Sequence, residues 1–135
     1  MKNKIFLMGI LMFGFIIVNS LIAQRDALFG IWVNTDGYEY HFNNGNYLTM
    51  QHDGTLWEIG TYTISGSVLI QTPTHRFLDQ NEPRVYSRDE WRNNGYPDFD
   101  LYFSPQTYMF LIRGDTLTLV HERGPTGADL YTKIL

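Results

Sequence analysis

The feature that most constrains this chain is the regular spacing of glycine-centred turns between short segments rich in tyrosine, threonine and branched aliphatic residues. Glycine readily adopts the positive φ angles of tight hairpin turns, and a neighbouring Asn, Asp or Ser reinforces the turn. Such turns occur at 43–45, 52–54, 65–67 and 113–115. No sustained helical period connects them. The pattern therefore predicts an all-β protein.

The segments between these turns predict strands that pair with their neighbours in sequence. Sequential hairpins give an antiparallel up-and-down meander, and about eight or more strands hide their edges best by closing into a barrel. We expect strands at 30–33, 38–42, 46–51, 55–64, 67–72, 84–86, 101–103, 107–112, 116–122 and 129–134.

The stretch 73–99 interrupts this rhythm with three prolines and many charges. Within it, Ser87 followed by Glu90 has the spacing of a helix capping box, and Gly95 supplies a stop signal. The sequence predicts a short helical insertion near 87–94. A plain insertion is the favoured interpretation, and a lid over one mouth of the barrel is the alternative.

The first residues have the pattern of a secretory signal peptide. Two lysines precede an apolar run at 5–18, and small residues follow up to Ala23. We expect a signal peptide at 1–23, a barrel domain at 24–135, and export to the bacterial periplasm or the cell exterior. An uncleaved anchor is the alternative. The chain has no cysteine, so neither a disulfide nor a cysteine-linked lipid can stabilise or tether it.

The charge balance excludes two classes of partner. Of 10 basic and 14 acidic residues, only Lys2 and Lys4 lie in the leader, so cleavage would change the formal charge from −4 to −6. An acidic surface is repelled by nucleic acid and by anionic lipid. We therefore expect no nucleic-acid partner, and no membrane association after the signal is removed.

Several motifs resemble those of a known family. Gly30-Ile31-Trp32 resembles the G-x-W that opens lipocalins, and the later hairpins are similar to those of small bacterial lipocalin-like (calycin-type) domains. The resemblance implies a barrel with Gly30 and Trp32 at its base, and Arg123 corresponds loosely to the family's late arginine that packs on this tryptophan. The family's T-D-Y motif has no counterpart. The hairpin motifs are Phe42-x-x-Gly45-x-Tyr47, Asp53-Gly54, Gly60-Thr61-Tyr62-x-Ile64-x-Gly66-x-x-Leu69 and Gly114-Asp115-Thr116-Leu117-x-Leu119.

The aromatic residues of the strands are the candidate ligand contacts. A barrel of about eight strands either fills its interior with side chains or holds one small ligand. A filled core is the simpler interpretation, and a pocket for a small hydrophobic or amphipathic molecule is the alternative. The residues expected to line such a pocket are Tyr40, Phe42, Tyr47, Trp57, Tyr62 and Tyr108.

Residues suited to catalysis or metal binding are sparse. The four histidines have no metal-ligand spacing, so no metal and no cofactor is expected. The chain lacks a nucleophile elbow, a phosphate loop and a cysteine nucleophile, which argues against an enzyme. Glu58 is the most interesting acid, because burial would raise its pKa. An outward, solvated Glu58 opposite an inward Trp57 is nevertheless the favoured interpretation.

These observations lead to three hypotheses about function. The first is an exported, non-catalytic binding protein that holds a small hydrophobic or amphipathic ligand in its barrel. The second is an envelope protein–protein interaction module or protease inhibitor, which would use the acidic surface and the loop around Trp91. The third and weakest is a hydrolase or isomerase that uses Glu58.

Overall fold

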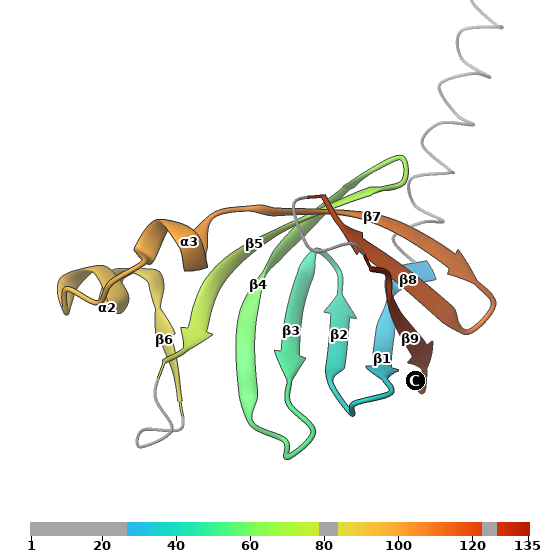
Figure 1. The fold of residues 1–135 in the computed structure, drawn as a ribbon, viewed down its shortest axis with the longest axis horizontal. Helices are drawn as coiled ribbons and strands as arrows, with labels where there is room; N and C mark the ends of the chain where they lie inside the picture. Colours follow the sequence, from blue (N-terminus) through green and yellow to red (C-terminus); the bar gives the residue numbers. More distant parts are fainter. Residues whose placement is uncertain (1–26, 79–83, 123–126) are drawn as a thin grey trace, which may run out of the picture.

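The computed structural model describes residues 27–78, 84–122 and 127–135, so the predicted signal peptide lies outside the described residues. Within these ranges the chain is dominated by antiparallel strands, with two short helices between β6 and β7 (Figure 1). The elements are β1 (Gly30–Asn34), β2 (Glu39–Asn43), β3 (Asn46–Met50), β4 (Leu56–Ser65), β5 (Val68–Phe77), β6 (Val85–Ser87), α2 (Arg88–Asn93), α3 (Phe99–Phe103), β7 (Gln106–Arg113), β8 (Thr116–His121) and β9 (Asp129–Lys133).

Eight of these strands form a closed antiparallel barrel. Each strand from β1 to β5 pairs with the next, β5 pairs with β7, and β9 returns to pair with β1. β6 pairs with the far end of β5 and lies outside the closed circuit. The all-β, up-and-down barrel expected from the turn spacing is therefore confirmed.

The β2–β3 hairpin shows why the turn residues are informative. Asn44 and Gly45 have φ angles of 53° and 88°. Positive φ at both central residues matches the twist of the flanking strands, and Asn followed by Gly is the pair that tolerates it best. The turn fixes the register that brings Phe42 opposite Tyr47.

Strand β5 is longer than expected, because it continues through Pro73 to Phe77. Proline lacks the N–H that a regular ladder requires, and it is tolerated where a bulge interrupts the pairing. The register between β4 and β5 shifts at this point, between Ile59 and Gly60, and Pro73 lies opposite Gly60. The extension matters for the site because it carries Arg76.

The expected strand at 101–103 is wrong, because these residues belong to α3. Phe99 and Phe103 are four residues apart, the spacing of one helix face, and their rings stack at 5.3 Å. Phe103 also contacts Trp91 of α2, with ring centroids 5.5 Å apart. Packing against a neighbouring helix thus overrides the strand propensity of a short aromatic segment.

The helical insertion predicted near 87–94 is confirmed, together with its capping box. The Glu90 N–H donates to Ser87 Oγ at 3.1 Å, and the Ser87 N–H donates to the Glu90 carboxylate at 2.7 Å. The insertion has its own small core, centred on Trp91, and it extends to one side of the barrel beside β5 (Figure 1).

Trp32 is fully buried in the barrel core. Its indole N–H donates to the Leu28 carbonyl at 2.8 Å, and Lys133 Nζ lies 5.3 Å from the ring centre. Arg123 lies outside the described residues, and Lys133 supplies the cation beside the indole. Gly30 is required here, since its φ is +130° and a Cβ would lie 2.1 Å from the Leu135 carbonyl oxygen.

Candidate functional site inside the barrel

Glu58 faces the interior of the barrel. It lies opposite Thr49 on β3 and Arg76 on β5, on the same face of β4 as Gly60 and Tyr62. The favoured interpretation of an outward Glu58 is therefore wrong. The apolar neighbours of Glu58 suggested the opposite face, but local partners on β3 and β5 compensate for the burial of its charge.

The Glu58 carboxylate has a partner at each oxygen. Tyr47 Oη donates to Oε1 at 2.5 Å, and Arg76 Nη1 lies 3.0 Å from Oε2. Arg76 Nη1 also donates to the Tyr102 carbonyl at 3.2 Å, and this contact connects the insertion to the barrel. Burial raises the pKa of Glu58, and the nearby Arg76 guanidinium and the Tyr47 hydrogen bond oppose this shift.

Gly60 makes the contact between Tyr47 and Glu58 possible. Tyr47 lies opposite Gly60, and its ring occupies the space that a side chain would take. A Cβ at Gly60 would lie 2.6 Å from Tyr47 Cε1 and 2.4 Å from the Thr72 carbonyl oxygen. The ring crosses β4 at this glycine, so that its hydroxyl reaches Glu58.

A second polar group links opposite walls of the barrel. Tyr40 Oη on β2 donates to Gln71 Oε1 on β5 at 3.4 Å. The Tyr40 ring stacks on Phe42 at 5.4 Å and meets the edge of Tyr131 at 5.3 Å. Burial raises the pKa values of Tyr40, Tyr108 and Tyr131, so these phenols stay neutral at physiological pH.

Three buried polar groups in this interior have no hydrogen-bond partner among the described residues. They are Thr49 Oγ1, Tyr62 Oη and Gln71 Nε2, on side chains that are 7%, 2% and 1% exposed. An unsatisfied buried donor or acceptor costs about 1–3 kcal/mol, so such groups are rare without a bound molecule or water. Their presence marks this part of the interior as a candidate binding site.

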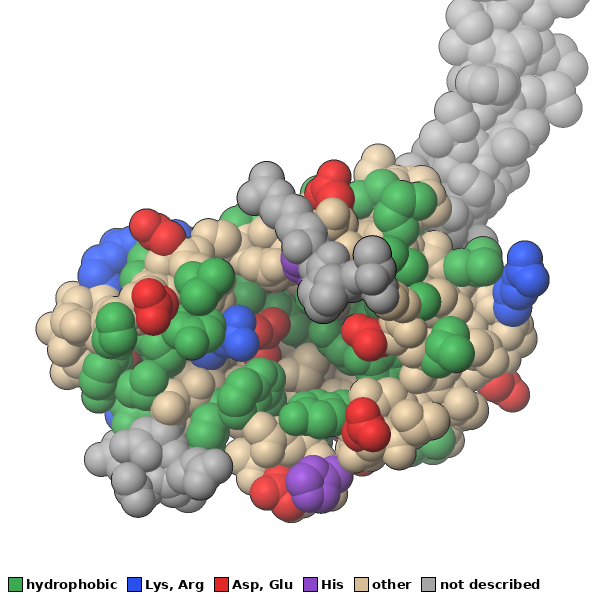
Figure 2. Space-filling view, in the orientation of Figure 1, with side chains coloured by type: hydrophobic (Ala, Val, Ile, Leu, Met, Phe, Trp, Pro, Cys, Tyr) green, Lys and Arg blue, Asp and Glu red, His purple; other side chains and the backbone are tan. Residues whose placement is uncertain are grey.

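Figure 2 shows a hollow near the middle of this face of the molecule, with acidic and basic side chains at its edge. Glu58 and Arg76, whose side chains are 12% and 18% exposed, form an ion pair on the inner face of the barrel. Asp129 lies opposite Leu119 on the inner face of β9 and adds negative charge near Tyr108 and Tyr131.

Five of the six expected ligand contacts face the interior. They are Tyr40, Phe42, Tyr47, Tyr62 and Tyr108, all packed in or against the barrel core. Trp57 lies on the other face of β4, where it stacks on Phe77 with ring centroids 5.4 Å apart. Sequence reasoning missed Thr49, Gln71 and Arg76, although Gln71 lies two residues after the core residue Leu69 and shares its face.

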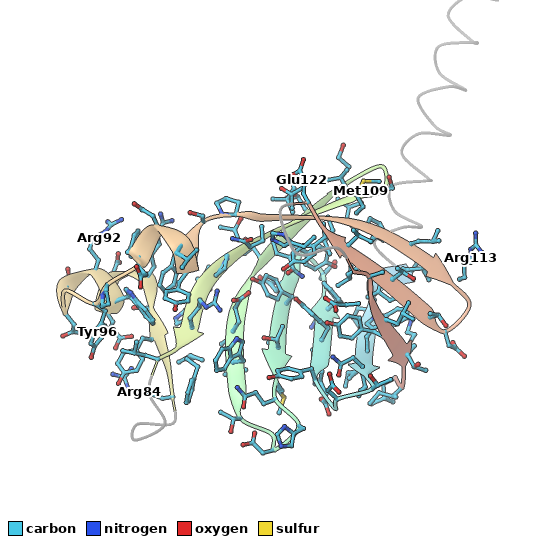
Figure 3. The ribbon with its side chains drawn as sticks, viewed as in Figure 1. Arg84, Arg92, Tyr96, Met109, Arg113 and Glu122 are labelled. Atoms are coloured by element: carbon cyan, nitrogen blue, oxygen red, sulfur yellow. The ribbon has the colours of Figure 1, made fainter. Side chains whose placement is uncertain are left out.

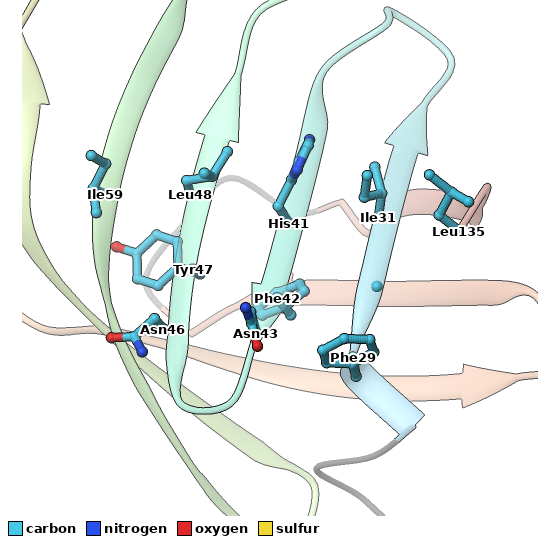
Figure 4. Close-up of a pocket in the computed structure, with 11 residues that line it drawn as sticks. Phe29, Ile31, His41, Phe42, Asn43, Asn46, Tyr47, Leu48, Ile59 and Leu135 are labelled. Carbon is cyan, nitrogen blue, oxygen red and sulfur yellow. The ribbon is translucent and has the colours of Figure 1, made fainter.

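A separate groove of about 490 Å³ lies on the outside of the barrel (Figure 4). Ile31, His41, Leu48 and Ile59 form a row across β1 to β4, because each is paired with the next. The groove is therefore largely apolar, and its volume falls within the range of small-molecule pockets. The other lining residues are Phe29, Gly30, Phe42, Asn43, Asn46, Tyr47 and Leu135.

The described residues include no group of three or more His, Cys, Asp or Glu side chains that could hold a metal ion. In the same ranges, no helix has the length and apolar character needed to cross a membrane.

Comparisons with known proteins support the fold. No family model matches the sequence, and a search of curated proteins found no match. The crystal structure of an uncharacterized protein from Bacteroides eggerthii is similar, with a TM-score of 0.50 and 17% identity. The match covers 79% of this chain and 99% of that chain. At this identity the likeness shows a shared fold alone.

Proposed function

We propose that this chain is an exported, non-catalytic binding protein that holds a small amphipathic molecule inside its lipocalin-like barrel. The observation that carries the proposal is the set of three unpartnered polar groups on Thr49, Tyr62 and Gln71. A purely structural core would pair these groups or replace them with apolar side chains. A ligand with one polar end satisfies the groups on Tyr62 and Gln71, which lie opposite each other, and covers the surrounding aromatic rings.

The arrangement around Glu58 supports binding rather than catalysis. A general acid or base needs an oxygen that can reach the substrate. Both oxygens of Glu58 are occupied, one by Tyr47 and the other by Arg76. We therefore assign Glu58 to positioning Tyr47 and Arg76 at the mouth.

Native mass spectrometry of the full chain, purified from cells that export it, tests this function. We expect a co-purifying small molecule that is released on denaturation. Failure to find one, together with failure of a neutral apolar fluorophore to bind, would contradict the proposal.

Two adjacent residues of β3 give a matched pair that locates the bound molecule. Thr49 faces the interior, whereas Leu48 lines the outer groove. Thr49→Phe fills interior space and should abolish binding, whereas Leu48→Gln should leave it unchanged. If Leu48→Gln abolishes binding and Thr49→Phe does not, the ligand binds in the outer groove and not in the interior.

An interaction module is the second candidate, favoured by an exposed apolar patch on the outer face of β7 to β9. Met109, Leu111, Val120 and Leu130 are each 40–57% exposed, and Figure 3 shows Met109 on the outer side of the barrel. Contiguous exposed apolar residues often mark protein-binding surfaces. A co-purifying protein that is lost in Leu111→Glu, with no small molecule present, would favour this candidate.

A further inference from the structure

We infer that the bound end of the ligand is uncharged and accepts hydrogen bonds, as a hydroxyl, carbonyl or amide oxygen does. This oxygen lies against Gln71 and Tyr62. The inference rests on the proposed binding function and specifies the chemical class of molecule that the interior accepts.

Two of the three unpartnered groups line one section of the interior. Tyr62 and Gln71 are directly opposite each other on β4 and β5. Thr49 lies apart from them, because its cross-strand partners are Tyr40 and Glu58, and Glu58 is about 13 Å from Tyr62 along β4. Cross-strand partners have Cβ atoms about 5 Å apart, so one small polar group can reach donors from adjacent strands.

The donors in this section determine which chemistry suits the ligand. The unpartnered end of Gln71 is an NH₂ group, which donates and does not accept. The Tyr62 hydroxyl can also donate. An oxygen acceptor with two lone pairs satisfies both groups, whereas an ammonium or other pure donor leaves the amide unpaired. Phe42, Leu69 and other apolar residues of the core surround this section, so the rest of the ligand is apolar.

The charges around this section argue against a carboxylate ligand. The Arg76 guanidinium already neutralises Glu58 and also bonds Tyr102. Asp129 adds a negative charge near Tyr108 and Tyr131.

Two further basic side chains of the inner face have contacts of their own. His121 bonds Gln106 at 2.7 Å, and Lys133 lies at the other end beside Trp32. A carboxylate would therefore bring an uncompensated charge into a buried site, which is strongly unfavourable.

Two probes of equal chain length separate the two ligand classes. Decanol and decanoate are each titrated at about neutral pH, where the acid is ionised, against the wild-type chain carrying a neutral apolar fluorophore. We expect decanol to displace the fluorophore at about a tenfold lower concentration. Equal or tighter binding of decanoate would overturn the inference and leave the binding function standing. If the fluorophore does not bind at all, the binding function fails as well.

Variants that remove single polar groups identify the contacts. Tyr62→Phe should weaken decanol binding by about tenfold, the effect expected for one lost hydrogen bond. Gln71→Leu should weaken it at least as much, because it also removes the acceptor of the Tyr40 hydroxyl. Tyr38→Phe is the matched control, because Tyr38 is 40% exposed, and it should change nothing. A Tyr62→Phe variant that binds decanol as tightly as wild type, together with an unchanged Gln71→Leu, would contradict the inference.

Discussion

The two ends of the barrel interior differ in how their polar groups are satisfied. At the Trp32 end, the buried indole N–H has a backbone acceptor and its ring has a cation beside it. At the mouth, Glu58 bonds both Tyr47 and Arg76, yet three buried groups of the interior have no partner among the described residues. The first end is built as a core, whereas the second retains hydrogen-bonding capacity that the fold itself does not use.

This difference predicts that side chains at the Trp32 end contribute to stability, whereas the unpartnered groups contribute to ligand binding. Substitutions at the Trp32 end remove packing that exists in the free protein, so they should lower its stability. Substitutions that remove only the Thr49 and Tyr62 hydroxyls take away nothing that the free fold uses, so they should leave stability intact, and loss of the Tyr62 hydroxyl should lower affinity. The predictions below test this separation, beginning with the largest expected effect.

Trp32→Ala should have the largest effect on stability. Truncation of a fully buried aromatic side chain costs about 3–5 kcal/mol of unfolding free energy, measured by urea denaturation. Trp57→Ala, on the outer face beside Phe77, is the control and should cost clearly less. Equal losses in the two variants would show that Trp32 does not hold the base of the barrel.

Arg76→Met should be the next most damaging change. It leaves Glu58 inside the barrel without its cation, and removing one partner of a buried pair costs about 3 kcal/mol. The additional substitution Glu58→Gln should restore part of this loss, because it removes the unpaired charge. Arg113→Met, at an exposed position, should change stability by no more than about 0.5 kcal/mol. Additive effects of Arg76→Met and Glu58→Gln would contradict their coupling.

Gly60→Ala tests the path of Tyr47 across β4. The added Cβ would collide with the Thr72 carbonyl and with the Tyr47 ring, and overpacking of this kind costs about 1–3 kcal/mol. Gly127→Ala is the matched control, since a Cβ there would have no atom of the described residues within 4 Å. A variant at position 60 as stable as the control would show that the ring does not depend on this glycine.

The raised pKa of Glu58 makes the free energy of unfolding depend on pH, and the direction of this dependence can be predicted. Because its pKa is raised in the folded state, the folded protein holds this proton more tightly than the unfolded chain. The stability that Glu58 contributes is therefore complete below about pH 4.3, its ordinary pKa, and is lost as the pH rises through the folded value. The unfolding free energies of wild type and Glu58→Gln are measured by denaturation across this pH window. As the pH rises, we expect wild type to lose stability relative to Glu58→Gln. The opposite trend would mean that the Arg76 pair dominates and lowers the pKa.

The sequence predicted the barrel because its evidence is local. Turn pairs such as Asn44-Gly45 report backbone angles directly, and the order of hairpins then fixes the meander. The capping box at Ser87 is local for the same reason. The strand expected at 101–103 failed because helix packing against Trp91, a tertiary contact, decides that segment.

The site was harder to predict because it depends on register. Five of the six expected aromatic contacts face inward, but Trp57 and Glu58 were assigned to the wrong faces of β4. A glutamate between two large apolar residues of a strand is expected to face outward when its partners on the neighbouring strands are not known. Those partners, Tyr47 and Arg76, are 11 and 18 positions away in the sequence, and pairing across β3 and β5 brings them to Glu58.

The unfolding free energy of the ligand-free double variant Thr49→Val/Tyr62→Phe shows whether the free fold depends on the unpartnered hydroxyls. Both substitutions keep the shape of the side chain and remove a hydroxyl that has no partner among the described residues. We predict a stability equal to that of the wild type, or higher by about 1 kcal/mol, because the cost of burying these hydroxyls disappears. A loss of more than about 1 kcal/mol would show that the fold itself uses these groups, which would contradict a binding site at the mouth of the barrel.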